Sequence, residues 1–331
     1  MLKKIDAVFE GGGVKGTGLV GAVSITEQSG YAFEHVAGTS AGAIVAACIA
    51  AGYTAKEMQE IMYGIEYAKF RDTGIEDKIP IIGSGISLLL TKGIYEGDFF
   101  EKWMRDILAK KGVRTFKDLR IQEYGDNPCH CYKLQVIASD LTRGRMLVLP
   151  RDMKEYDIDP DTVDVAWAVR MSMSIPFFYK PVVLKDRGGT PYYVVDGGIL
   201  SNYPVWIFEE DGHSVSHPTI GYKLVDPEEG KPHSIGGPIS LLKALFSTMM
   251  EAHDAKYIRT KNFMRTIPIE TLGVQTTDFD ITLRQKEALY ESGKKAAEKF
   301  FKKWNFEEYK KKSSEFPENG RMNAVWDEKG S

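Results

Sequence analysis

The sequence predicts an α/β protein in which helices cover both faces of a central sheet. Short runs of β-branched and apolar residues alternate with longer segments of helical periodicity through most of the 331 residues. The composition, 43% hydrophobic and 27% charged, is close to the average of globular domains. A chain of this length is long enough to bury a sizeable core as one large domain or two ordinary ones.

Six short runs have the apolar, β-branched character of strands. They are Ile5–Phe9, Phe33–Ala37, Leu134–Ser139, Met146–Leu149, Tyr192–Val195 and Ile220–Val225.

Helical periodicity follows or separates these runs, and Asp161 is placed to cap the helix that begins at Thr162. The predicted helices are Val14–Glu27, Ala41–Ala51, Glu57–Tyr63, Phe99–Lys110, Thr162–Met173, Ile239–Asn262 and Thr282–Trp304.

The net charge and the lengths of the apolar stretches argue against a nucleic-acid-binding protein, a membrane-spanning protein and an exported protein. The net charge of −3 provides no global field for nucleic acid, so we expect no nucleic-acid partner. The longest apolar stretch, Ala41–Gly52, is shorter than the roughly 18 to 20 residues that span a bilayer. Asp6 and Glu10 interrupt the apolar region of any export signal, so we expect a cytoplasmic protein.

The three cysteines suggest no disulfide framework, since their number is odd. Cys129, His130 and Cys131 are metal-ligand types at close spacing, but a structural zinc site needs four ligands and no second cluster lies at ligand spacing. We therefore expect neither a metal nor another cofactor.

Residues 72–97 are broken by glycine and proline, which predicts a flap. The apolar stretches Ile79–Ile82 and Ile86–Leu90 within it are either tucked inward or inserted into lipid. The sequence leaves both open.

A glycine-rich loop follows the first predicted strand. Gly11, Gly12 and Gly13 have no side chains to shield their amide hydrogens, which can therefore converge on one anion at the start of a helix. With Gly16, the loop also satisfies the G-x-G-x-x-G pattern of dinucleotide-binding folds. In such folds an acidic residue ends the second strand, whereas here Glu34 lies near that strand's start.

The second predicted strand ends in a G-x-S-x-G motif, Gly38 to Gly42, and a helix follows. A serine in a sharp strand-to-helix turn points its hydroxyl out of the sheet, and glycine two residues to either side avoids a collision. This context predicts that Ser40 is a nucleophile.

A nucleophilic serine needs a base. None of the later histidines lies in a glycine-rich loop or another loop of defined conformation, so they are poor candidates for the base. They are His213, His217, His233 and His253. Asp196 ends an apolar strand and is followed by two glycines, at the kind of position where open α/β sheets place functional groups. The alternative is that Asp196 only orders a tight turn.

These segments together resemble the signatures of patatin-like phospholipases. The glycine loop, the Ser40 motif and Asp196-Gly197-Gly198 occur in the family's order. Ala138–Gly144 resembles the family's A-T-D-L-x-x-G turn, and Ser172–Phe178 resembles its S-x-S/A-x-P-x-x-F segment. The resemblance covers residues 4 to about 205 and implies a three-layer α/β/α fold with a mainly parallel central sheet.

The resemblance also implies a chemistry. Ser40 and Asp196 would form a catalytic dyad without histidine, and the amides of Gly11, Gly12 and Gly13 would form the oxyanion hole. Lys15 would contact a phospholipid phosphate, or it would pack over the loop with its ammonium in solvent. Asp140 and Gly144 would shape a turn.

Residues 1–226 would be the catalytic domain and residues 227–331 a helical extension packed on it.

Residues 294–312 carry eight lysines interleaved with aromatic side chains. This pattern suits either a helix that packs its aromatics on the domain or an anchor at the surface of a membrane.

The predicted function is hydrolysis of phospholipid or lysophospholipid esters, with peripheral contact to a membrane. Acyl transfer by the same dyad, a vestigial lipid-binding or storage protein, and a nucleotide binder remain as alternatives.

Overall fold

The computed structural model describes residues 2–70, 95–127, 130–208, 217–227 and 264–315, and scattered positions between 235 and 249. Most of the predicted flap at 72–97 and most of the predicted helix at 239–262 lie outside these residues.

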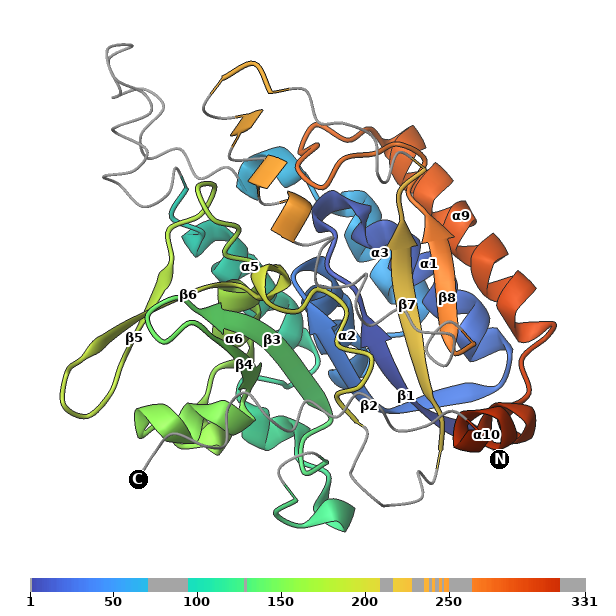
Figure 1. The fold of residues 1–331 in the computed structure, drawn as a ribbon, viewed down its shortest axis with the longest axis horizontal. Coiled ribbons are helices and arrows are strands. Elements are labelled where there is room, and N and C mark those ends of the chain that lie inside the picture. The colour runs from blue at the N-terminus through green and yellow to red at the C-terminus, as the bar shows by residue number, and fades with distance from the viewer. Residues whose placement is uncertain are drawn as a thin grey trace.

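The described residues form one sheet of eight strands (Figure 1). Seven strands follow the order β5-β6-β3-β2-β1-β7-β8, and β4 pairs with β3. The strands are β1 (Lys3–Phe9), β2 (Tyr31–Thr39), β3 (Leu134–Asp140), β4 (Arg145–Leu149), β5 (Val182–Lys185), β6 (Pro191–Asp196), β7 (Thr219–Val225) and β8 (Thr266–Glu270). All six predicted strands are confirmed, whereas β5 and β8 were not predicted.

The sheet is mainly parallel, as the sequence predicts. The pairs β1–β2, β1–β7, β2–β3 and β7–β8 are parallel. The pairs β3–β4, β3–β6 and β5–β6 are antiparallel. Helices connect β1 to β2 and β2 to β3. Because the strands of these pairs are parallel, their carboxyl ends meet at one edge of the sheet.

Except for α10 (Phe306–Glu315), which was not predicted, the helices match predicted segments, with shifted ends. They are α1 (Gly16–Gln28), α2 (Ala41–Ala50), α3 (Ala55–Gly64), α5 (Asp98–Lys110), α6 (Val165–Ser172), α9 (Leu283–Phe301) and α10 (Phe306–Glu315). Capping boxes fix the starts of α3, with Thr54 and Glu57, and of α9, with Thr282 and Gln285.

The predicted cap of α6 is wrong. The helix begins at Val165, and Asp164 caps it by accepting a hydrogen bond from the backbone N–H of Trp167 (3.0 Å). The carboxyl of Asp161 instead binds the Tyr132 hydroxyl (2.5 Å) and an Arg120 guanidinium (3.1 Å). A carboxylate already engaged by two donors is not available to cap a helix.

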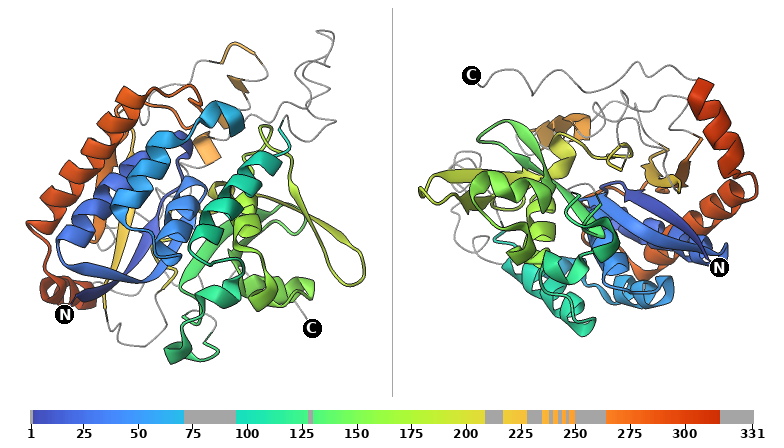
Figure 2. Two further views of the ribbon diagram at one scale, coloured as in Figure 1. Left: turned by 180° about the vertical axis from the view of Figure 1, so that it is seen from behind. Right: turned by 90° about the horizontal axis from the view of Figure 1, so that it is seen from below.

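Helices cover one face of the sheet, where the main hydrophobic core lies (Figure 2). On the other face, Val8, Ala37 and Ile137 pack under the segment 203–208, so the predicted helical layer on this second face stays a prediction. The two buried faces explain why the central strands are almost continuously apolar.

Residues beyond β7 join the same core. β8 pairs with β7, and α9 packs along α1. A Cβ atom on Gly21 would lie 2.0 Å from the Tyr290 carbonyl oxygen, so glycine allows this close approach of the two helices. The Phe301 ring stacks on Tyr31 with centroids 5.1 Å apart. The proposed domain division after residue 226 stays a prediction.

Among the described residues, no helix has both the length and the apolar character that crossing a membrane requires.

Candidate active site

Ser40 occupies a strained turn between β2 and α2. Its backbone has φ 52° and ψ −124°, a conformation that residues other than glycine rarely adopt. A Cβ on Gly38 would lie 2.3 Å from the Gly42 carbonyl carbon, and one on Gly42 would lie 2.2 Å from the Phe9 carbonyl oxygen. Both glycines of the motif are therefore required by the packing of the turn, as the sequence predicts.

Ser172, for which the sequence predicts no role, holds this turn in place. The backbone N–H of Ser40 donates to Ser172 Oγ (2.8 Å), and that hydroxyl donates to the Ile137 carbonyl oxygen (2.5 Å). The Ser40 hydroxyl itself contacts Met173 Sδ at 3.5 Å. Ser172 therefore connects the turn both to the end of α6 and to β3.

Asp196 ends β6, and the sheet register brings it beside the strand that neighbours β2. It pairs with Ala138 of β3, while Ile137 pairs with Thr39, the residue before Ser40. β6 runs antiparallel to β3, so Asp196 reaches this region from the opposite direction to the parallel strands. Its backbone N–H donates to the Ser174 carbonyl oxygen (2.9 Å).

The Asp196 carboxyl is fully buried. Burial is the largest influence and raises its pKa to about 7, opposed by a hydrogen bond from the Gly198 N–H (2.8 Å) and by the Ser40 hydroxyl. Within the described part of the chain, Oδ2 of this carboxyl accepts no well-formed hydrogen bond. Oδ2 is therefore the oxygen with capacity to take up a proton.

The glycine loop abuts the serine turn. A Cβ on Gly11 would lie 3.1 Å from Ser40 Cβ and 2.3 Å from Asn202 Oδ1. The Gly11 N–H donates to the Asn202 carbonyl oxygen (3.2 Å), and Asn202 Nδ2 donates to the Gly11 carbonyl oxygen (3.3 Å). Across the described ranges, Gly12 and Gly13 donate no backbone hydrogen bond.

Gly13 adopts φ 55°, and a Cβ there would lie 2.1 Å from the Thr276 carbonyl oxygen. Lys15 ends the short 3₁₀ turn Gly13–Lys15, and its stem passes Gly12, since a Cβ on Gly12 would lie 3.4 Å from Lys15 Cε. The loop is thus closed by Asn202 on one side and by Thr276 on the other.

Asp140 shapes the turn after β3, as predicted. Its Oδ1 accepts hydrogen bonds from the backbone N–H groups of Thr142 (2.8 Å) and Arg143 (3.2 Å). Gly144 completes the turn with φ 64°.

Arg170 is a buried residue that the sequence analysis did not single out. It donates to the Ser174 hydroxyl, to the Glu96 carbonyl oxygen and to the Lys180 carbonyl oxygen (3.1 Å). Because Ser174 also receives the Asp196 N–H, Arg170 supports the segment that positions Asp196.

Of the four candidate histidines, the structure describes His217, and this side chain does not reach Ser40. His217 lies before the start of β7 and binds Asp6, whereas Ser40 follows the end of β2, at the other end of these parallel strands. His213, His233 and His253 lie outside the described residues.

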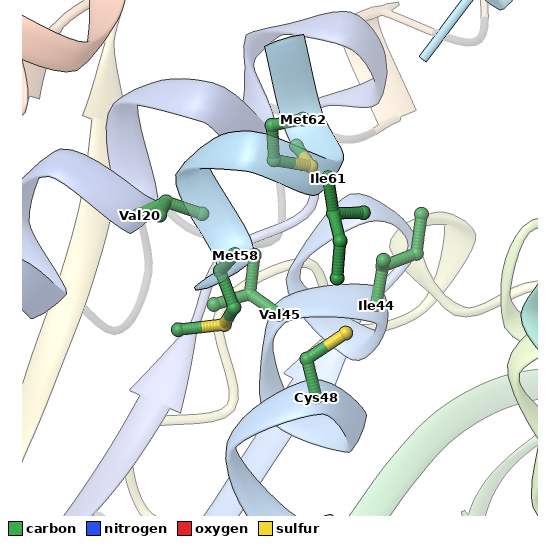
Figure 3. Close-up of a pocket in the computed structure, with 7 residues that line it drawn as sticks. All are labelled: Val20, Ile44, Val45, Cys48, Met58, Ile61 and Met62. Carbon is green, nitrogen blue, oxygen red and sulfur yellow. The ribbon is translucent and has the colours of Figure 1, made fainter. Parts of the chain in front are cut away.

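A small apolar cavity of about 10 Å³ lies between α1, α2 and α3 (Figure 3). Ile44, one turn after Ser40, is among its lining residues; the others are Val20, Val45, Cys48, Met58, Ile61 and Met62. It has room for about one water-sized group, so no acyl chain fits without movement of these helices.

Comparisons with known proteins agree with this geometry. Residues 7–209 match the family model "Patatin-like phospholipase". The chain is 43% identical over 303 residues to the uncharacterized protein YqhO of Bacillus subtilis (strain 168), covering 91% of this chain and 99% of that protein. It is 26% identical to an uncharacterized protein of Acanthamoeba polyphaga mimivirus, covering 88% of this chain and 91% of that protein.

Among solved structures, VipD from Legionella pneumophila has the same fold, with a TM-score of 0.53 and 18% identity. The match covers 90% of this chain and 66% of VipD. Since the family model spans more than half of the sequence, and the sheet and the glycine and serine turns fit it, the chain belongs to the patatin-like phospholipase family.

Proposed function

We propose that the protein is a serine lipid acyl hydrolase that cleaves carboxylic esters of phospholipids or lysophospholipids with a Ser40–Asp196 dyad. The observation that carries this proposal is the pairing of a serine at a strained turn with a buried carboxyl that interacts with it and has a pKa of about 7. A base whose pKa lies near the working pH is suited both to accept and to return a proton.

In the acylation step, Ser40 Oγ forms a bond to the ester carbonyl carbon while its proton passes to Asp196. The tetrahedral intermediate then breaks its carbon–oxygen bond to the alcohol, which takes the proton from Asp196. The product is an acyl-Ser40 intermediate and a free alcohol or lysolipid.

In the deacylation step, Asp196 takes a proton from water as the water oxygen bonds to the acyl carbon. The bond to Ser40 Oγ breaks, Oγ recovers the proton from Asp196, and the fatty acid leaves. Neither step requires a histidine or a cofactor.

The amides of Gly12 and Gly13 are the oxyanion donors in this proposal, because the Gly11 amide is engaged with Asn202 and fixes the loop. Loss of one such donor typically raises the barrier by about 2.7 to 4 kcal/mol. Lys15 stands at the edge of the same loop, where its ammonium can meet a phosphate on the substrate.

We place the reaction in the cytoplasm, at the surface of a lipid aggregate or membrane. The buried free thiols Cys48 and Cys131 fit a reducing compartment. The aromatic residues at the end of α9 are packed on the domain, whereas Lys302 and Lys303 are exposed and can contact anionic lipid.

The test is to incubate the purified protein with a mixed lipid extract and identify consumed and released species by mass spectrometry. Ser40→Ala and Asp196→Asn should each abolish fatty-acid release while circular dichroism shows a native fold. Fatty-acid release by either folded variant at the wild-type rate would refute the dyad. A product in which added alcohol or lysolipid carries the acyl group would assign acyl transfer instead of hydrolysis.

A further inference from the structure

Three potential metal ligands meet inside the protein, away from Ser40. Asp6 of β1, His35 of β2 and His217 offer ligand atoms that all lie within 4.8 Å of one another. Asp6 Oδ1 is 2.8 Å from His35 Nδ1 and 2.9 Å from His217 Nε2. The side chains of Asp6 and His35 are at most 2% exposed and that of His217 is 11% exposed.

The fold brings together residues that are 29 and 211 positions apart in the sequence. β1 lies between β2 and β7, and the Asp6 N–H donates to the Pro218 carbonyl oxygen (2.9 Å) beside His217. This position is toward the amino end of the parallel strands, whereas Ser40 follows the carboxyl end of β2. The cluster is therefore distinct from the candidate active site.

An irregularity in the sheet aims His35 at Asp6. Ile5 pairs with Phe33 and Ala7 with Val36, so Asp6 alone faces two residues of β2. The His35 N–H consequently donates to Asp6 Oδ1 (3.1 Å) instead of to the strand ladder. Such bulges redirect side chains, and they are common beside functional sites.

The contacts of His35 leave either a proton or a metal ion between its Nδ1 atom and Asp6. His35 Nε2 lies 3.0 Å from the His130 carbonyl oxygen, which can only accept, so Nε2 carries the hydrogen. In a neutral ring Nδ1 then has a lone pair, and it lies 2.8 Å from a carboxylate oxygen. Two acceptor atoms at this distance repel each other unless a proton or a metal ion lies between them.

The donor set matches a transition metal. Two imidazole nitrogens and a carboxylate oxygen are ligands typical of Zn²⁺ and related divalent ions. A backbone carbonyl on the second ring nitrogen of a ligating histidine is a usual outer contact, since it fixes the tautomer. The rings of Tyr124 and Phe208, with centroids 4.9 and 5.6 Å from His35, hold the imidazole in place.

We propose that Asp6, His35 and His217 supply three ligands to one divalent transition-metal ion, Zn²⁺ or a close analogue, and that a water molecule completes the fourth position of the coordination sphere. The ion ties β1 and β2 to the segment that enters β7, so it stabilises the sheet and takes no part in ester cleavage. The sequence does not reveal this cluster, because its three residues are far apart in the chain and do not form a short metal-binding motif.

The experiment treats the full-length protein with a chelator, adds back Zn²⁺ or Co²⁺, and measures stoichiometry and affinity by calorimetry and by the visible absorption of Co²⁺. We expect one ion per chain. His35→Gln or His217→Gln should weaken binding at least about 10-fold, since even outer contacts contribute that much.

His130→Gln is the matched control, because His130 contributes its backbone oxygen and a neighbouring imidazole but no proposed ligand. It should bind as the wild type does, and so should Ser40→Ala, which separates this proposal from the proposed hydrolase activity. Absence of Zn²⁺ and Co²⁺ binding by the wild type would show that a proton holds the cluster and would overturn the proposal. Equal binding by the histidine variants would overturn the ligand set.

If the histidine variants do not fold, X-ray absorption of the wild-type Co²⁺ form decides the question. Two imidazole ligands and a carboxylate support the proposal, whereas sulfur ligands or a fully hydrated ion contradict it.

Discussion

The hydroxyl of Ser172 accepts the backbone N–H of Ser40 at 2.8 Å and donates to the Ile137 carbonyl oxygen at 2.5 Å. A single buried side chain thus connects the strained turn to the sheet. Strained conformations persist only where the surrounding structure fixes them. Under the proposed dyad, Ser172 is therefore a positioning residue, which fixes the backbone turn that carries the Ser40 hydroxyl.

Replacing Ser172 by alanine should reduce kcat while leaving KM nearly unchanged. The Ser40 N–H would lose its buried acceptor, at a cost of about 1 to 3 kcal/mol, and a shift of the hydroxyl would lower kcat roughly 10- to 100-fold. Steady-state kinetics on a soluble ester measures both constants. The control is Ser24→Ala, which removes another buried serine hydroxyl, bonded to the Gly21 carbonyl oxygen, and should leave kcat unchanged. Equal kcat losses in both variants would indicate a general loss of stability instead.

The rate should depend on pH through Asp196. This carboxyl must be ionised to accept the Ser40 proton, and its pKa is raised to about 7. We therefore expect kcat/KM to increase with pH up to about 7 and to level off above it. Initial rates across about two pH units on either side test this. A midpoint near the ordinary aspartate value of about 4 would contradict the role of burial.

The raised pKa of Asp196 should also make the free energy of unfolding depend on pH. Because the folded state raises the pKa of Asp196 from 3.8 to about 7, it binds a proton that the unfolded chain releases in this window. The contribution of Asp196 to the free energy of unfolding therefore falls between about pH 4 and about pH 7, by up to about 4 kcal/mol.

Asp196→Asn removes that dependence, so the variant should gain stability relative to the wild type as the pH rises through this window. Urea unfolding at both ends of the window measures the difference. A constant difference between the two proteins would mean that Asp196 titrates normally in the folded state.

Gly13→Ala should displace the backbone amides of the glycine loop and thereby lower kcat. A methyl group there meets the Thr276 carbonyl oxygen at 2.1 Å, and φ 55° is unfavourable for alanine. Displacement of an oxyanion donor lowers kcat by about 10² to 10³. Gly64→Ala, where the added Cβ meets nothing within 4 Å, should keep full activity. Unchanged turnover in Gly13→Ala would remove this loop from the mechanism.

The sequence was informative where local chemistry decides the structure. The apolar runs predict six strands, and the glycines around Ser40 predict its sharp turn. The strand β8 was missed because Pro268 interrupts the pattern of Thr266–Glu270. Proline is tolerated there because β8 lies at the edge of the sheet.

The contacts of the site depend on tertiary packing, which the sequence does not display. Arg170 has the pattern of an ordinary helix residue, and the motif that begins at Ser172 does not reveal that its hydroxyl binds the Ser40 N–H, yet both residues support the segment that carries Asp196 or Ser40. The raised pKa of Asp196 likewise follows from complete burial. The cluster of Asp6 with two histidines requires the order of β2, β1 and β7 in the sheet, which no local pattern encodes.

The most direct test of the dyad is the rate and position of covalent labelling by a fluorophosphonate, followed by peptide mass mapping. The probe phosphonylates an activated serine, so we predict one adduct per chain, at Ser40, and a rate at least about 100-fold lower in Asp196→Asn. Modification of a different residue, or labelling of Ser40 at the same rate without the Asp196 carboxylate, would contradict the account.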